Sequence, residues 1–205
     1  RVSVPATSAN LGPGFDCLGL ALNLRNELTL SAAGPDLSAA GASTTYTVQM
    51  SGVDAEKVPA DDNNLAVQAA ETLFRHIGRR PSAVSLQMSN CIPVGSGLGS
   101  SSSAIVAALV GANALFGSPA PTEELLRLAV AMEGHPDNVA PAMLGGLVLG
   151  VLPDAEFGPA ELIVRRWPPP ALPAVVVLPD VQLLTSAARA VLPPTVTRAE
   201  AIFNA

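Results

Sequence analysis

The stretch from Cys91 to Ser103 constrains the fold most, because it is rich in glycine and serine and leads directly into an apolar run. Gly95, Gly97 and Gly99 stand at alternate positions, where the backbone can take positive φ and bring its N–H groups close to a ligand. The serines fall where a helix should begin, and Ala104 to Phe116 predicts a buried helix.

A loop of this kind at a helix start predicts a concave anion site, because the first N–H groups of a helix have no intrahelical partner. A contact with the helix dipole contributes only about 0.3–1 kcal/mol at an exposed site, so a triphosphate would also need a divalent cation and several donors. The loop does not end in the Gly-Lys-Ser/Thr of a Walker A motif, and its spacing does not fit a dinucleotide fingerprint. A flexible turn with a serine N-cap is the simpler alternative.

The remaining segments predict a mixture of strands and helices. Strands are predicted at Arg1 to Thr7, Phe15 to Leu30, Thr44 to Met50, Ala83 to Ser89, Gly145 to Leu152 and, as a buried strand, Ala174 to Leu178, with a loop at Pro35 to Ser43. Further helices are predicted at Leu65 to Ile77, after an Asp-Asp-Asn-Asn cap, at Thr122 to Glu133 and at Thr185 to Val191. The elements lack the regular strand-helix alternation of a doubly wound fold, which favours the α+β class. The proline-dense Trp167 to Pro173 predicts a boundary between domains 1–167 and 168–205.

Composition excludes several classes of protein. Hydrophobic residues make up 49% of the 205 residues but aromatic residues only 3%, so the core must consist of Ala, Val and Leu. The net charge of −6, with no basic run longer than two, argues against a nucleic-acid partner. The sequence also has no apolar run of the roughly 18 residues that a membrane span needs and no signal-peptide pattern. Cys17 and Cys91 share no metal-ligand spacing and are predicted to be buried, unpaired thiols in a reducing cytosol, so a cytoplasmic location is expected.

Four segments together resemble one known family. Pro93 to Ser103 resembles the central motif of the superfamily of galactokinase, homoserine kinase, mevalonate kinase and phosphomevalonate kinase. Pro5 to Gly19, Glu133 to Pro141 and Thr185 to Pro193 are similar to the homoserine kinase branch of it. The resemblance covers essentially the whole chain.

The resemblance implies a fold and an activity. The fold would be a ribosomal-S5-domain-2-like N-terminal domain, followed by the start of a ferredoxin-like C-terminal domain that this chain leaves incomplete. The activity would be Mg²⁺-dependent transfer of a phosphoryl group from ATP to the side-chain hydroxyl of L-homoserine. A homodimer is possible, and neither nucleic acid nor a membrane is expected as a partner.

The resemblance also assigns residues to the site. The nucleotide would be held by Asn64, Pro93, Val94, Gly95, Ser96, Gly97, Leu98, Gly99, Ser100, Ser101, Ser102 and Ser103. Mg²⁺ would be held by Ser101 and Glu133, and homoserine by Asn10, Asp16, His135, Asp137, Thr185 and Arg189. Asp137 and Asn138 would stand at the reacting centre. The chemistry agrees, because a zwitterionic substrate needs carboxylates for its ammonium group and an arginine for its carboxylate.

Several of these residues have simpler structural explanations. Asp16 could close an Asx-turn, and His135 could be a loop histidine with its hydrogen bonds satisfied. Glu133 could cap a helix end, although a carboxylate is unfavourable there. Thr185 could be an N-cap, and Arg189 could be a solvated surface arginine.

One departure bears on the mechanism. Relatives such as mevalonate kinase are thought to use an aspartate base where this sequence has Asn138, and an amide cannot accept a proton at neutral pH. Positioning of the reactants is therefore expected to dominate. The alternatives are a related kinase acting on another alcohol, a catalytically inactive nucleotide-binding module, and a scaffold without nucleotide affinity.

Overall fold

The computed structural model describes residues 1–38, 43–156, 158–169, 171, 173–178, 190–193 and 195–204. Its strands are β1 (Val2–Ala9), β2 (Leu18–Ser38), β3 (Thr45–Gly52), β4 (Arg79–Asn90), β5 (Leu147–Val151) and β6 (Ile163–Trp167). Its helices are α1 (Leu65–Ile77), α2 (Ser100–Leu115), α3 (Thr122–Glu133), α4 (Pro136–Leu144) and α6 (Arg198–Asn204), with a 3₁₀ helix η1 at Ala55–Lys57. Within these described ranges, no helix has the length and apolar character to cross a membrane.

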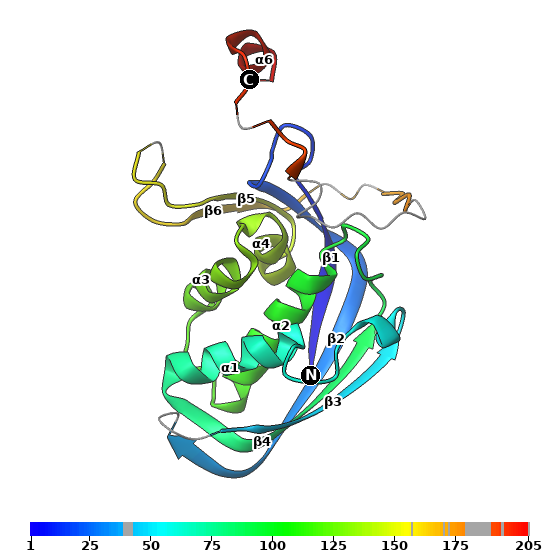
Figure 1. The fold of residues 1–205 in the computed structure, drawn as a ribbon, viewed down its shortest axis with the longest axis vertical. Helices are drawn as coiled ribbons and strands as arrows, with labels where there is room; N and C mark the ends of the chain where they lie inside the picture. The colour runs from blue at the N-terminus through cyan, green and yellow to red at the C-terminus, as the bar shows by residue number, and fades with distance from the viewer. Residues whose placement is uncertain are drawn as a thin grey trace.

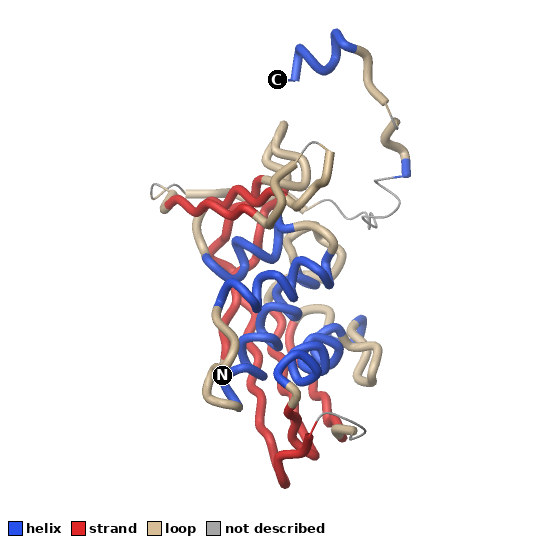
Figure 2. Tube along the Cα trace, turned by 90° about the vertical axis from the view of Figure 1, so that its left-hand side faces the viewer, coloured by secondary structure: helices blue, strands red, loops and turns tan. Residues whose placement is uncertain are grey.

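The six strands form one mixed sheet built around β2. The path is β3-β4-β2-β5-β6, and β1 pairs with β2 outside this path. Only β3 and β4 run parallel; the other neighbours are antiparallel. Because β2 is 21 residues long, it pairs with β1, β4 and β5 along different parts of its length. Figures 1 and 2 show helices α1 to α4 gathered on one face of this sheet.

The core lies between the sheet and the helices, and it is built from small aliphatic side chains as the composition predicts. Phe74 is the one aromatic residue among the fully buried hydrophobic residues that the structure describes. Its ring packs edge-on against that of Phe116, with ring centroids 5.8 Å apart. Helix α2 is buried on most sides because it contacts β1, β2, α1, α3 and α4. Its N-terminal end is therefore held firmly by the packing of the rest of the helix.

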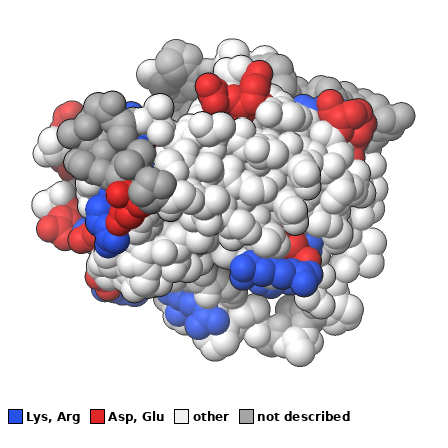
Figure 3. Space-filling model, turned by 90° about the horizontal axis from the view of Figure 1, so that it is seen from below, with Lys and Arg blue, Asp and Glu red and all other residues white. Residues whose placement is uncertain are grey.

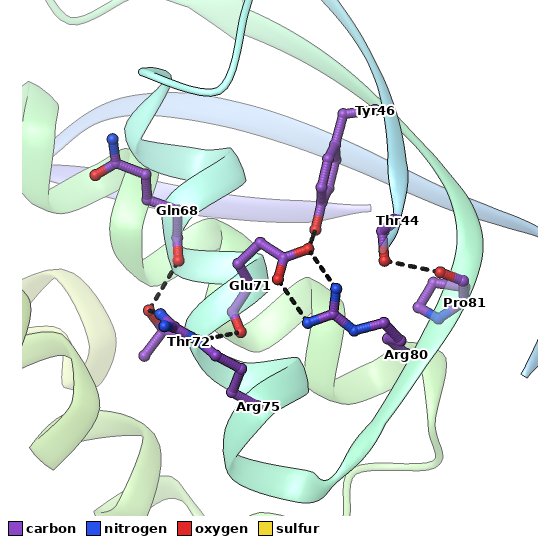
Figure 4. Close-up of polar contacts among 8 residues, drawn as sticks. All are labelled: Thr44, Tyr46, Gln68, Glu71, Thr72, Arg75, Arg80 and Pro81. Carbon is purple, nitrogen blue, oxygen red and sulfur yellow. Dashed lines mark hydrogen bonds and ion pairs between the residues drawn. The ribbon is translucent and has the colours of Figure 1, made fainter. Parts of the chain in front are cut away.

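A polar cluster joins α1 to the edge strand β3 and its neighbour β4 (Figure 4). Arg80 Nη2 lies 2.8 Å from Glu71 Oε2, and the Tyr46 hydroxyl donates to Glu71 Oε1 at 2.7 Å. The arginine side chain is only 7% exposed, and its Nε has no hydrogen-bond partner within the described part of the chain. Burial, reinforced by the hydrogen bond to Glu71, raises the pKa of Tyr46 far above its ordinary value.

Charged side chains are sparse over part of the surface. Figure 3 views the molecule from below and shows Lys and Arg as separate spots on a largely uncharged face. On this face, the basic side chains form no continuous stripe of the kind that follows a nucleic-acid backbone.

Most predicted elements are confirmed. The helix at Leu65–Ile77 has the predicted bounds, and Asn64 is its N-cap, accepting a hydrogen bond from Ala66 N. The helix at Thr122–Glu133 also has the predicted bounds, although Pro121 rather than Thr122 takes the N-cap position. The predicted loop at Pro35 to Ser43 is wrong in its first part, because β2 continues to Ser38 and pairs there with β4.

Two further predictions are wrong. The apolar run Ala174 to Leu178 is not a buried strand: it has no regular structure, and Val175 is 91% exposed. A strand needs a neighbour to complete its backbone hydrogen bonds, and none of the described strands pairs with this run. The cysteines are unpaired as predicted, but Cys91 is exposed and Cys17 is only partly buried. The ribosomal-S5-like and ferredoxin-like assignments and the boundary at residue 167 stay predictions.

Candidate functional site

A cavity of about 470 Å³ lies where the glycine-serine loop meets the sheet. Its walls come from the end of β1, from the segment between η1 and α1, from the loop before α2, and from the turn between α3 and α4. The lining residues include Asn10, Asn64, Val94, Gly95, Ser96, Gly97, Gly99, Ser100, Ser101, Glu133, His135, Asp137 and Asn138. Segments from distant parts of the sequence thus bring most of the predicted site residues to one cavity.

The loop has the conformation that its glycines predict. Gly95, Gly97 and Gly99 all take positive φ, at 72°, 75° and 68°. The N–H groups of Gly95, Ser96 and Gly97 have no hydrogen-bond acceptor among the described residues. Helix α2 follows directly, and its first intrahelical bond runs from Ser103 N to the Gly99 carbonyl, so the preceding N–H groups have no helical partner. The loop therefore presents a set of unpaired backbone donors.

Asn26 holds both ends of this loop, a role that the sequence did not predict. Its Oδ1 accepts hydrogen bonds from Cys91 N at 2.8 Å and Ile92 N at 3.0 Å, before the loop. Its Nδ2 donates to Ser103 Oγ at 2.9 Å, after the loop. Because Asn26 is 5% exposed and lies in the central strand β2, it ties the loop to the most extensively paired strand of the sheet.

Asp54 supports the loop from the other side. Its Oδ2 accepts a hydrogen bond from Val94 N at 2.9 Å, and its Oδ1 lies 2.7 Å from Lys57 Nζ. The hydrogen bond from Lys57 and that from Val94 together hold the pKa of the Asp54 carboxyl below its usual value. The carboxylate thus stays ionised and fixes the loop just before its first glycine.

Three oxygen-bearing side chains meet at the start of α2. Glu133 Oε1 lies 2.8 Å from Ser102 Oγ and 3.2 Å from Ser101 Oγ. Ser101 and Glu133 are the two residues predicted to share a cation, and Ser102 is an additional neighbour. Glu133 is the last residue of α3, where a carboxylate is disfavoured by the dipole of its own helix. The serine hydroxyls at the positive end of α2 explain why the Glu133 carboxylate is tolerated at the end of α3. Hydroxyl and carboxylate oxygens suit a hard divalent cation.

A second polar cluster adjoins the cavity, which His135 and Asp137 line and Asp16 does not. Asp16, His135 and Asp137 can each place one ligating atom within 4.8 Å of the others. His135 Nδ1 is 2.5 Å from Asp137 Oδ1, and the Asp137 side chain is only 1% exposed. The hydrogen bond with Asp137 raises the pKa of His135 above its usual value, against an opposing effect of burial. Burial and the nearby Asp137 and Asp16 likewise raise the pKa of the Cys17 thiol.

Features of the backbone position the residues of this cluster. Pro136 is the first residue of α4, where proline is favourable because its missing N–H would have no partner. A Cβ at Gly19 would lie 1.7 Å from the Asp137 carbonyl oxygen, so only glycine in β2 lets α4 approach this closely. Asp16 takes φ of 57°, and its N–H donates to Asn10 Oδ1 at 3.0 Å. Part of the role of Asn10 is therefore to fix the turn that carries Asp16.

The other predicted residues fall into three groups. Asn64 lines the cavity, but its amide oxygen caps α1 and its nitrogen donates to the Pro59 carbonyl at 2.6 Å. Leu98 is buried and packs with Ala6 and Ile92, and like Pro93, Ser102 and Ser103 it does not line the cavity. Thr185 and Arg189 lie outside the described residues.

Asn138 lines the cavity next to the acidic cluster and has a buried partner that the sequence did not predict. The Thr7 hydroxyl donates to Asn138 Oδ1 at 2.6 Å, and Thr7 is fully buried in β1. A Cβ at Gly99 would lie 2.1 Å from Thr7 Oγ1, so the loop backbone packs directly on this pair. Contacts of this kind join residues 131 positions apart and leave no local signal in the sequence.

Comparison with known proteins gives a consistent result. Residues 64–146 match the family of the GHMP kinases N terminal domain. The chain is 47% identical over 204 residues to a homoserine kinase of Gloeobacter violaceus and 45% identical over 204 residues to that of Moorella thermoacetica. These matches cover 100% and 99% of the chain, but 64% of each relative. The chain thus spans less than two thirds of the length of these curated relatives.

Solved structures agree on the fold. The homoserine kinase of Cytophaga hutchinsonii is 27% identical with a TM-score of 0.78, and the match covers 98% of this chain and 62% of that one. A putative homoserine kinase of Listeria monocytogenes is 35% identical with a TM-score of 0.65, covering 92% of this chain and 62% of that one. The glycine loop, the oxygen cluster at α2 and these matches all agree: residues 64–146 match the GHMP kinases N terminal domain, and the chain is similar along its length to homoserine kinases.

Proposed function

We propose that the protein phosphorylates the side-chain hydroxyl of L-homoserine with ATP, giving O-phospho-L-homoserine and ADP. In this reaction the bond between the γ-phosphorus and the β,γ-bridging oxygen breaks, and a bond from the homoserine side-chain oxygen to that phosphorus forms. ADP leaves with the bridging oxygen, and the hydroxyl proton passes to solvent. Relatives named homoserine kinase, 41–47% identical over almost the whole chain, support this choice of substrate.

The observation that supports the proposal is that the glycine loop and two residues of the Asp16, His135 and Asp137 cluster, His135 and Asp137, line the same cavity. The unpaired N–H groups of the loop and the start of α2 can bind phosphate oxygens. The cluster of Asp16, His135 and Asp137 lies beside it and can bind the ammonium group of an amino acid. A nucleotide tail in the loop would therefore end next to the substrate, which is the positioning that phosphoryl transfer requires.

Ser101 and Glu133 would hold Mg²⁺, which keeps most of its waters in such sites and needs few protein ligands. When bound there, the ion would neutralise charge on the phosphate oxygens. The Glu133 carboxylate is already within 3.2 Å of both neighbouring serine hydroxyls, so the protein oxygens are gathered at one point.

The substrate would be aligned by the cluster of Asp16, His135 and Asp137. Asp16 and Asp137 would receive the ammonium group, with Asn10 fixing the turn that carries Asp16 and His135 fixing Asp137. We assign recognition of the carboxylate to Thr185 and Arg189, as the family resemblance implies. Asn138 would position the reactants rather than accept a proton.

The direct test uses the full-length protein with ATP, Mg²⁺ and L-homoserine. Phosphorus NMR should show a new phosphate monoester in step with ADP release, and L-homoserine should be preferred over a panel of other amino-acid and isoprenoid alcohols. Turnover of another alcohol in place of homoserine would show that the protein is a related kinase with a different substrate. Nucleotide binding without any turnover would reject the proposed enzymatic activity.

The metal assignment has its own test. Ser101→Ala and Glu133→Ala should each lower kcat at least about tenfold, equivalent to about 1.4 kcal/mol. Glu123→Ala is the matched control, because Glu123 lies exposed in the first turn of the same helix α3, away from the cavity. Full activity of both site variants at saturating Mg²⁺ would reject the assignment.

A further inference from the structure

Thr7 stands where three parts of the site meet. Its backbone N–H donates to the Leu98 carbonyl at 3.0 Å, which ties β1 to the glycine loop. Its hydroxyl lies 2.6 Å from Asn138 Oδ1, which ties β1 to α4. The backbone of Gly99 packs on this pair, since an added Cβ there would lie 2.1 Å from Thr7 Oγ1 and 3.1 Å from Asn138 Oδ1. Thr7 is fully buried, so solvent does not compete for these contacts.

In this contact the oxygen of the Asn138 amide lies toward Thr7, which leaves the amide nitrogen on the other side. An amide oxygen can only accept, so the Thr7 hydroxyl donates to it and occupies one of its lone pairs. The amide nitrogen sits on the other branch of the side chain and takes no acceptor among the described residues. It is not among the buried polar atoms that lack a partner, so it is open to the cavity that Asn138 lines.

The charge of the expected ligand favours the same orientation. With the nitrogen toward the cavity, Asn138 offers two N–H donors beside the loop that would hold the phosphates. The opposite orientation would place a carbonyl oxygen against phosphate oxygens and leave the site without these donors. An N–H donor aimed at a group that carries developing negative charge contributes directly to lowering the barrier.

We propose that Thr7 is a positioning residue, whose hydroxyl holds Asn138 so that its amide nitrogen donates to an oxygen of the transferred phosphoryl group. This proposal rests on the proposed kinase function. Asn138 then stabilises charge during the transfer described above, and it takes no proton itself. Thr7 acts only through Asn138, without touching the substrate.

Activity measurements on the full-length protein test this link. Thr7→Val keeps the shape of the side chain and removes the hydroxyl; it should lower kcat about tenfold and change KM for ATP less than about twofold. Thr7→Ser keeps the hydroxyl and should recover most of kcat. Thr72→Val is the matched control, since it removes a threonine hydroxyl that donates to the Gln68 carbonyl outside the cavity, and it should leave kcat unchanged.

A double-mutant cycle separates positioning from general disruption. In an Asn138→Ala background, Thr7→Val should have no further effect on kcat, because the amide that it positions is gone. An equal loss of kcat in both backgrounds would overturn the proposal. So would a Thr7→Ser variant as impaired as Thr7→Val.

The contact can also be measured without turnover, which separates failure of this proposal from failure of the kinase function. In nitrogen-15 NMR spectra, the side-chain amide pair of Asn138 is identified by its loss in Asn138→Ala. Thr7→Val should shift this pair, and Thr7→Ser should leave it in place. If the wild-type protein lacks kinase activity, the proposed function fails while this spectrum still tests the contact. If the protein is active but the pair does not move in Thr7→Val, the positioning role is wrong.

Discussion

Replacement of Asn26 by alanine should destabilise the protein and weaken nucleotide binding together. The side chain makes three hydrogen bonds, accepting from Cys91 N and Ile92 N and donating to Ser103 Oγ, and it is 5% exposed. At about 1 kcal/mol for each net hydrogen bond, the loss amounts to about 3 kcal/mol, with more if the buried amides stay unsatisfied. For a chain of this size, each kcal/mol lowers Tm by about 2–4 °C, so Tm should fall by about 6–12 °C.

Asn113→Ala is a matched control for this variant. Asn113 is 4% exposed in α2 and makes two hydrogen bonds, both to the backbone of Ala120, outside the cavity. By the same reasoning it should lose about 2 kcal/mol and about 4–8 °C in Tm. The stability loss of Asn113→Ala should therefore be somewhat smaller than that of Asn26→Ala.

The two variants should differ in nucleotide affinity. Thermal and urea unfolding measure stability, and calorimetric titration with ADP and Mg²⁺ measures binding well below Tm. Asn26→Ala should bind at least about tenfold more weakly, because both anchors of the loop are lost, whereas Asn113→Ala should bind normally. Equal nucleotide affinity in the two variants would refute the claim that Asn26 orders the loop, and a smaller stability loss in Asn26→Ala than in Asn113→Ala would refute the hydrogen-bond reasoning.

Three other perturbations test separate contacts. Arg80→Met leaves the Glu71 carboxylate without its ion partner and should lower the free energy of unfolding by about 2–4 kcal/mol, measured with urea. The double variant with Glu71→Met should recover part of that loss, and additive losses from the two substitutions would contradict this. The pKa of Tyr46 is raised in the folded state, so its neutral hydroxyl contributes to the free energy of unfolding. This contribution is fully present below the unfolded pKa of about 10 and is lost as the pH rises above that value. Tyr46→Phe should therefore lose less stability than the wild type between pH 8 and pH 10.5, and identical pH dependence would contradict this. Gly99→Ala places a Cβ 2.1 Å from Thr7 Oγ1 at a φ of 68°, so it should weaken ADP binding at least about tenfold, and normal affinity would show that the loop has room to shift.

Local signals explain what the sequence predicts well. The helix at Leu65–Ile77 has an asparagine cap before it and a glycine at its C-terminal end, and both its bounds are predicted correctly. The nine-residue helix α4 is missed because Pro136 and Pro141 resemble helix breakers. One of these prolines is in fact favourable, because it occupies the first helical position. A short helix with an internal proline is formed by its packing rather than by its own propensity.

Non-local signals explain what the sequence misses in the site. The glycine loop can be predicted because positive φ and unpaired helix-start amides follow from residue types that are adjacent in sequence. The polar residues that hold the loop and its neighbours in place, Asn26 and Thr7, act on partners as far as 77 and 131 positions away. In the sequence they are single polar residues within strands, where a surface-facing position explains them equally well. Only the pairing of β1 with β2 and the approach of α4 turn them inward, so such supports become visible when tertiary contacts are known.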